Sequence, residues 1–302
     1  MMKMTKNKAA LTLTAVAASV LVACGGGGST APATKSAKMT AALGALNGAT
    51  CTATEIGSVP VRTFTASGTT NASGQVNFDG LPLDVGSLIV SCKGGSYFDE
   101  ATGTTVTLLA TDTIKSVLPA GSTETAVTPL TSLVASRVEQ ALVGKPAGTK
   151  VSAAEITQTA TQIAAVFAPG VDLLAPPRVV ASAADVAGIT AGDSANKYAA
   201  ALAGLSKLAK DSAGGDHLAL LDTLLADVSD GVIGDDLAAD LGLANLSALN
   251  TALTQAVSDT VSPAVAAATD DRATTGTVES PTTTPPTGTG GSGTGGTGGS
   301  NT

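Results

Sequence analysis

The spacing of apolar residues changes near residue 128, and this change most constrains the fold. Before it, residues 46–120 are rich in Val, Thr and Gly, with alternating runs such as VPVRTFTA and SLIVSC between turn sequences such as NASG and FDGLP. Alternation of apolar and polar positions is typical of half-buried strands. From residue 127 to residue 269 the apolar residues recur every three to four positions, as in amphipathic helices. The sequence therefore predicts an α+β protein, with a small antiparallel β domain followed by a helical domain.

Five main helices are expected, over residues 128–144, 152–167, 194–210, 216–228 and 243–261. Thr128 and Pro129 suit the N-cap and the first position of the first helix. Ser152 and Glu155 have the spacing of a capping box at the start of the second. Pro263 is expected to end or kink the last one. Their apolar stripes predict that the helices pack as a bundle.

The first 23 residues have the organisation of an export signal. Lys3, Lys6 and Lys8 precede the uncharged apolar stretch AALTLTAVAASVLVA at residues 9–23. That stretch is about 15 residues long, whereas a membrane-spanning helix needs roughly 20. We therefore expect residues 1–23 to be removed as a signal peptide.

The residues LVAC at positions 21–24 resemble the lipobox of bacterial lipoproteins. The resemblance implies cleavage before Cys24, a diacylglycerol on its thiol and a fatty acyl chain such as palmitate on its new amino group, so that the acyl chains anchor the protein to a membrane. Gly25 stands where an aspartate would commonly signal inner-membrane retention, so the outer membrane is the expected location, with the protein facing either the periplasm or the outside. The alternative is an ordinary secretory signal with a free cysteine near the cleavage point.

Composition predicts unstructured segments on both sides of the folded part. Residues 24–45 begin with the anchoring cysteine and continue GGGGSTAPATKSAK, so they are expected to form a flexible linker. Residues 270–302 are rich in Thr, Gly and Pro and cannot bury enough apolar surface to order themselves. They are expected to form a disordered tail.

The stretch GTTNASGQVNFDGLPLDVGSLIVSCKGG at residues 68–95 resembles the carboxypeptidase-regulatory-like, prealbumin-type β domain. The shared pattern is a Thr-rich strand, an Asn-x-x-Gly turn, an aromatic strand, an LP pair and a returning strand. The resemblance implies a β-sandwich and a non-catalytic folding or binding role. Five segments also resemble a group of bacterial surface proteins and lipoproteins without an established activity, at residues 94–108, 127–137, 167–174, 197–209 and 227–237.

Cys51 and Cys92 lie inside the predicted β domain and form an even pair once Cys24 is assigned to the lipid. Export places them in an oxidising compartment, so a disulfide between them is expected. The alternative is two separate buried thiols. A redox or thiolate-catalysis role is disfavoured, because the sequence has no C-x-x-C motif and no histidine near either cysteine.

The segment DVSDGVIGDDL contains a weak candidate for a Ca²⁺ site, formed by Asp227, Asp230, Asp235 and Asp236. An EF-hand needs oxygen ligands at positions 1, 3 and 5, glycine at position 6 and an acid at position 12. Neither possible register of this segment meets that requirement. A solvated helix junction capped by acidic residues is the favoured interpretation.

His217 is the only histidine, and it starts an amphipathic helix beside Asp216, so helix capping and exposure to solvent are the expected explanation for it. The adjacent acids of DEATG at residues 99–103 are interpreted as a solvated turn, because paired-carboxylate catalysis needs two groups that face each other. One histidine and a paired set of cysteines cannot supply the usual zinc ligands. No catalytic residue, resident metal or cofactor is therefore predicted.

Charge limits the classes of partner. Loss of residues 1–23 leaves 13 basic and 24 acidic residues, a net charge of about −11, and nucleic-acid binding would need a basic surface instead. The absence of Trp and the scarcity of Tyr and Phe limit binding by aromatic stacking. The expected function is that of a lipid-anchored cell-envelope protein that binds or scaffolds an unknown protein or surface ligand. The alternatives are an envelope hydrolase that uses carboxylates, and an accessory subunit of an export or surface-assembly machine.

Overall fold

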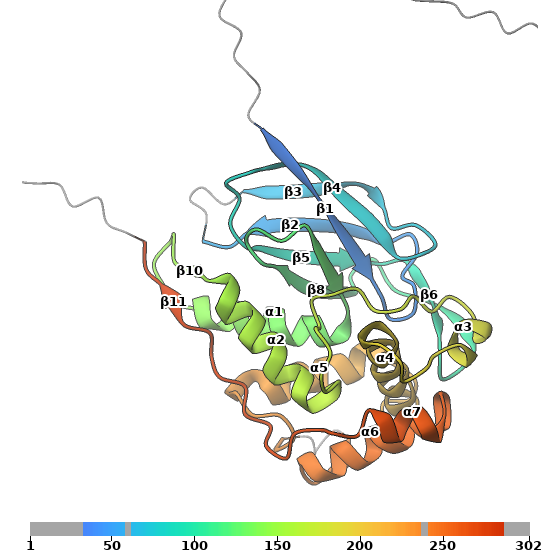
Figure 1. Cartoon of the computed structure of the whole chain (residues 1–302). Helices are drawn as coiled ribbons and strands as arrows, with labels where there is room; N and C mark the ends of the chain where they lie inside the picture. The colour runs from blue at the N-terminus through green and yellow to red at the C-terminus, as the bar shows by residue number, and fades with distance from the viewer. Residues whose placement is uncertain (1–32, 58–61, 237–240, 287–302) are drawn as a thin grey trace, which may run out of the picture. The chain divides into compact units, whose positions relative to one another are not determined.

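The computed structural model describes residues 33–57, 62–236 and 241–286, which belong to one compact unit that begins at Ala33 (Figure 1). The strands are β1 Thr34–Ala41, β2 Thr50–Glu55, β3 Thr63–Thr69, β4 Gln75–Pro82, β5 Leu88–Lys93, β6 Ser96–Asp99, β7 Thr104–Thr107, β8 Thr113–Leu118, β9 Glu124–Val127, β10 Lys150–Val151 and β11 Thr283–Thr284. The helices are α1 Pro129–Leu142, α2 Ala153–Phe167, α3 Ala183–Ala187, α4 Ser194–Ser212, α5 His217–Asp227, η1 Val228–Asp230, α6 Leu246–Thr260 and α7 Pro263–Ala268. Most strands precede the helices, which confirms the predicted α+β class.

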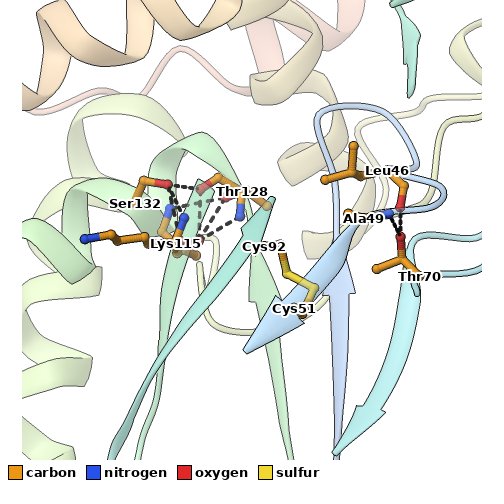
Figure 2. The surroundings of a disulfide bond; sticks show 9 residues. Leu46, Ala49, Cys51, Thr70, Cys92, Lys115, Thr128 and Ser132 are labelled. Atoms are coloured by element: carbon orange, nitrogen blue, oxygen red, sulfur yellow. Dashed lines mark hydrogen bonds between the residues drawn. A yellow bond between two sulfur atoms is a disulfide. The ribbon is translucent and has the colours of Figure 1, made fainter. Parts of the chain in front are cut away.

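The larger sheet has the strand order β3-β2-β5-β8, and all of its pairings are antiparallel. Its strands alternate as the sequence predicts: Cys51 and Ala53 of β2 are buried, as are Val90 and Cys92 of β5, while the residues between them are partly exposed. Cys51 lies directly opposite Cys92, and a disulfide joins them (Figure 2). The pair therefore links the two central strands of this sheet.

The second sheet has the order β4-β1-β9 and corrects two expectations. Strand β1 pairs antiparallel with β4 but parallel with β9, so the β region is not purely antiparallel. Strand β1 also begins at Thr34, so the flexible linker predicted for residues 24–45 is wrong from that residue onward. Composition could not reveal this strand, because its order comes from ladder hydrogen bonds to segments far away in the sequence.

A single hydrophobic core joins the strands to the helices. It contains Met39 and Phe78 from the three-stranded sheet, Val90 from the four-stranded sheet, Leu133 from α1 and Phe167 from α2. The residues before and after the change in periodicity therefore share one core rather than two separate ones.

Helix α1 docks on strand β8 through hydroxyl groups of its first turn, in addition to the apolar side chains that both elements give to the core. Thr131 Oγ1 donates to the carbonyl of Lys115 at 2.8 Å, and Ser132 Oγ accepts from the Lys115 amide at 2.8 Å (Figure 2). Thr128 is the N-cap and Pro129 is in the first turn, as the sequence predicts. The start of the helix is thus fixed to the edge of the larger sheet.

The five predicted main helices are confirmed by α1, α2, α4, α5 and α6. Pro263 marks the break after α6, where it occupies the first turn of the short helix α7.

Tyr198 of α4 is fully buried. Its phenol oxygen lies 2.7 Å from Thr128 Oγ1 and donates to the carbonyl of Leu173 at 3.1 Å. This one phenol connects α4 to the start of α1 and to the loop after α2. No helix within the described ranges combines the length and hydrophobicity needed to cross a membrane.

The segment at residues 270–286 packs against the helices, so the disordered tail predicted for residues 270–302 is wrong for this part. Val278 is buried, and β11 pairs with β10. Arg137 of α1 donates to the carbonyl of Val278 at 3.0 Å and to Ser280 Oγ at 2.8 Å. The segment has few apolar side chains and is held mainly by hydrogen bonds to its backbone. Composition alone does not reveal such hydrogen bonds. Residues 287–302 lie outside the described residues.

Candidate functional site

The single histidine is buried, which corrects the exposure expected for it. His217 opens α5 and its residue is 8% exposed, while Asp216 accepts from the amides of Leu218 and Ala219 as the N-cap. Nε2 of His217 lies 3.1 Å from Oδ2 of Asp99, a residue of the β6–β7 hairpin. The capping role of Asp216 is confirmed. The burial comes from a hairpin 118 positions away in the chain.

Asp99 is the centre of a buried polar cluster. Its Oδ1 accepts from Ser206 Oγ of α4 at 2.7 Å and from the amides of Ala101 at 2.8 Å and Thr102 at 3.1 Å. Burial works to raise the pKa of Asp99, but the hydrogen bonds from His217 and Ser206 outweigh it and hold that pKa well below its ordinary value. The carboxylate is therefore ionised, and it accepts hydrogen bonds only.

Glu100, the next residue, has the opposite environment. It is buried, and its Oε2 has no hydrogen-bond partner within the described residues. Burial raises the pKa of Glu100 well above its ordinary value, and the negative charge of Asp99 adds to the effect. The protonated acid is therefore favoured. The solvated turn expected at residues 99–103 is wrong for both acids, because Asp99 is buried against α4 and α5 and Glu100 is buried as well.

An open cleft of about 540 Å³ lies beside this cluster, next to the start of α5. Its apolar lining is provided by Val106, Leu108, Leu109 and Leu218. Its acidic lining is provided by Asp112, Asp216 and Asp222. We call it the acidic cleft. A cleft of this volume is within the range of small-ligand sites.

Tyr97 and His217 connect the acidic cleft to the buried cluster, because both residues line the cleft. Their ring centroids are 5.5 Å apart in an edge-to-face arrangement. Burial, and then the negative charge of Asp99, raises the pKa of the Tyr97 phenol, which therefore stays protonated. Tyr97 and Asp99 lie two positions apart on the buried side of β6. That alternation in the sequence YFDE is the signal by which Asp99 could have been recognised as buried.

The buried cluster is arranged for packing rather than for nucleophilic attack. A catalytic serine needs a base in hydrogen-bond contact with its hydroxyl, whereas Ser206 Oγ and His217 Nε2 both bind the same carboxylate. Ser206 is also fully buried. The cluster instead ties the β6–β7 hairpin to α4 and α5.

The four acids of the weak Ca²⁺ candidate do not stay together as one group. Asp227 is buried and accepts from the amides of Gly234 at 2.8 Å and Asp236 at 3.0 Å, so it closes its own loop. Asp230, Asp235 and Asp236 are exposed and can bring one oxygen each within 4.8 Å of the others. Binding through one oxygen each, these three carboxylates would supply at most half of the six to eight oxygens that Ca²⁺ takes. Asp230, Asp235 and Asp236 thus form an acidic surface loop, and the hydrogen bonds of Asp227 hold the backbone of that loop.

The sequence predicts a role for each of the three cysteines, and the structure describes two of them. The disulfide of Cys51 and Cys92 is present and fully buried. Cys24, the predicted lipid attachment point, lies outside the described residues.

A larger open groove of about 900 Å³ follows α2 and is lined mainly by Ala, Thr, Gln and Pro. The acidic cleft differs from it in having polar side chains from a buried cluster in its lining.

Comparison of the chain with protein-family models, with curated proteins and with solved structures gave no match.

Proposed function

We propose that the protein is a lipid-anchored cell-envelope protein with a non-catalytic binding or scaffolding role. Cys24 is the point of lipid attachment in this proposal, and the outer membrane is the site of anchoring. The lipobox-like LVAC and the charged, apolar segment before it support the anchor. The buried disulfide of Cys51 and Cys92 is in keeping with an oxidising compartment.

The observation that supports the binding role is the hydrogen bonding of the polar residues around His217 to one another, beside an open cleft. Asp99, Ser206 and His217 satisfy one another inside the protein, and an open cleft with an apolar and acidic lining lies next to them. This arrangement gives a rigid surface with a hollow, and it offers no activated nucleophile within the described residues. A hollow with apolar walls and a few polar side chains is the usual form of a binding site.

We also propose a finer description of the fold. The two sheets form a sandwich of the carboxypeptidase-regulatory-like type, and the main helices form a bundle against it. Support comes from the residues that both sheets give to one core, such as Phe78 and Val90.

The anchor is tested by replacing the acylated residue. The variant Cys24→Ser is expected to accumulate as an unprocessed or soluble product, whereas the wild type partitions into the detergent phase on phase separation. Ser29→Ala is the matched control, because it changes a residue outside the lipobox and leaves the disulfide intact, so it is expected to leave partition unchanged. A Cys24→Ser product that still enters the detergent phase would show that the anchor proposal is wrong.

Orientation is tested separately, with an epitope placed after Thr302 and protease added to cells. Loss of the epitope on intact cells assigns the protein to the outer surface, where ligands of the surroundings are its partners. Protection until the cells are permeabilised assigns it to the periplasm, where envelope-assembly proteins are its partners. Equal loss from a cytoplasmic control protein would show only that the cells had lysed, and the assay is then repeated on intact cells.

A further inference from the structure

We propose that the acidic cleft binds an arginine side chain from a segment of a partner protein. The inference rests on the proposed binding role, but it does not depend on the lipid anchor. Four properties of the cleft lead to it: two polar atoms at the cleft without a partner among the described residues, their capacity to accept hydrogen bonds, uncompensated negative charge, and apolar walls.

The first property is unsatisfied hydrogen-bonding capacity at the cleft. Tyr97 is 2% exposed and His217 is 8% exposed, and both line the cleft. Within the described residues, neither the phenol oxygen of Tyr97 nor Nδ1 of His217 has a hydrogen-bond partner, since the only polar contact of His217 is the one from Nε2 to Asp99. Both residues line the open cleft, so a ligand there can replace the hydrogen bonds that these two atoms make with water.

The second property is the direction of the missing hydrogen bond. The Asp99 carboxylate only accepts, so Nε2 of His217 carries the proton that lies between them. With a single proton on the ring, Nδ1 keeps a lone pair and can accept a hydrogen bond, and the phenol of Tyr97 can both donate and accept. The cleft can therefore accept hydrogen bonds from N–H donors of a ligand, and the charge of its lining decides which class of ligand is favoured.

The third property is charge. Asp112, Asp216 and Asp222 line the cleft, and its lining contains no lysine or arginine. Asp112 and Asp216 each use one oxygen on backbone amides, at Leu109 and Leu218 among others. Asp222 makes no hydrogen bond or ion pair within the described part of the chain. A cationic donor is thus favoured over a neutral one.

The fourth property separates arginine from a metal ion and from a small polar cation. Among the described residues, only Asp230, Asp235 and Asp236 are close enough to share an ion, and they lie outside this cleft. The acceptors of the cleft are instead spread out, which matches the planar fork of five N–H donors on a guanidinium. Leu109, which is 69% exposed, and Leu218 offer apolar contact to the stem of the arginine and to its neighbours in a peptide.

The uniqueness of His217 makes the test direct. The full chain, in a nonionic detergent and without a histidine tag, is labelled at histidine and observed by NMR, so that every imidazole signal reports on this cleft. Butylguanidinium is the probe, and neutral butylurea is its matched control. Butylguanidinium is expected to shift the signals saturably, with a Kd of about 1–10 mM for a fragment of this size. Butylurea is expected to leave them in place.

Two variants of equal charge check the location. Asp222→Asn is expected to weaken butylguanidinium binding about two- to fivefold, as for an exposed ion pair. Asp79→Asn removes an exposed carboxylate of β4 outside the cleft and is expected to leave the Kd unchanged. No saturable shift, an equal shift with butylurea, or an equal effect of both variants would overturn the proposal.

The nature of the occupant is tested with the blocked tripeptide N-acetyl-Leu-Arg-Leu-amide. Its leucines are expected to contact the apolar walls and make binding at least about fivefold tighter than that of butylguanidinium. If the peptide binds no more tightly, the occupant is a small guanidinium compound and the assignment to a partner protein is wrong. A failure of this test leaves the detergent-phase result for Cys24→Ser unaffected, so the two proposals fail independently.

Discussion

Asp99 and Glu100 are neighbours in sequence, and their surroundings move their pKa values in opposite directions. Four groups donate to Asp99 from the helices and its own turn, whereas Glu100 is buried with one oxygen lacking a partner. Both departures are measurable as a dependence of stability on pH, because a pKa that differs between the folded and unfolded states couples protonation to folding.

Glu100→Gln is expected to raise the free energy of unfolding at neutral pH. The pKa of Glu100 is raised in the folded protein, so the unfolded chain releases its proton first as the pH rises above about 4.5. The wild type therefore loses stability between that pH and the folded pKa, and glutamine, which has no proton to lose, does not. Urea unfolding of both proteins at pH 5 and pH 8 checks this. The advantage of the variant should be larger at pH 8, and an advantage that shrinks as the pH rises would contradict the assignment.

Asp99→Asn is expected to have the opposite effect. The pKa of Asp99 is lowered in the folded protein, so its contribution is present above the unfolded value of about 3.8 and is lost as the pH falls below it. Asparagine loses the charge-assisted bonds from Ser206 and His217, which we expect to lower the free energy of unfolding by about 3 kcal/mol at pH 7. The deficit relative to wild type should shrink toward pH 3. A deficit that stays constant over that range would show that the charge of Asp99 plays no part.

At the scale of single elements, helices were predictable and several strands were not. The first residues of α1 and α2 could be predicted from Thr128, Pro129 and Ser152, because an N-cap side chain binds backbone amides two or three positions later in the sequence. Strand β1 and the pair β10–β11 depend on distant partners, and their segments look like linker and tail by composition. The candidate site shares this limit. His217 could be singled out as the only histidine, but its contact with Asp99 depends on how a hairpin and two helices meet.

The disulfide is an element-scale constraint, since it joins the central strands β2 and β5 across a loop of 41 positions. Replacing both Cys51 and Cys92 by Ala is expected to lower the free energy of unfolding by about 4 kcal/mol, the value for restricting the unfolded chain over a loop of this length. Guanidinium unfolding with and without reductant measures the effect. Reductant should destabilise the wild type and leave the double variant unchanged. A wild type that unfolds at the same midpoint in both conditions would contradict the prediction.

At the scale of the whole molecule, the C-terminal segment completes the packing around α1. Arg137 is buried and donates to the carbonyls of Ser229 and Val278, and to Ser280 Oγ. The guanidinium thereby joins three parts of the chain: α1, the turn at η1, and the segment that leads to β11. A buried cation is stable only while its donors find acceptors. The fold described by the structure therefore extends past the last helix.

Two truncated chains test whether residues 276–286 stabilise the fold or behave as the disordered tail that composition predicts. A chain that ends at Thr275 loses Val278 and two acceptors of Arg137, and we expect its free energy of unfolding to fall by about 3–5 kcal/mol. A chain that ends at Pro286 keeps all of these contacts, and we expect it to match the full chain within about 0.5 kcal/mol. Thermal unfolding followed by circular dichroism compares the three.

Arg137→Lys in the full chain gives the matched point variant. Lysine retains the positive charge but cannot reach several acceptors at once, because it lacks the planar fork of arginine. Its stability should therefore lie between those of the full chain and the chain that ends at Thr275. If both the short chain and Arg137→Lys unfold at the wild-type temperature, residues 276–286 do not stabilise the fold, and their contacts with α1 are incidental.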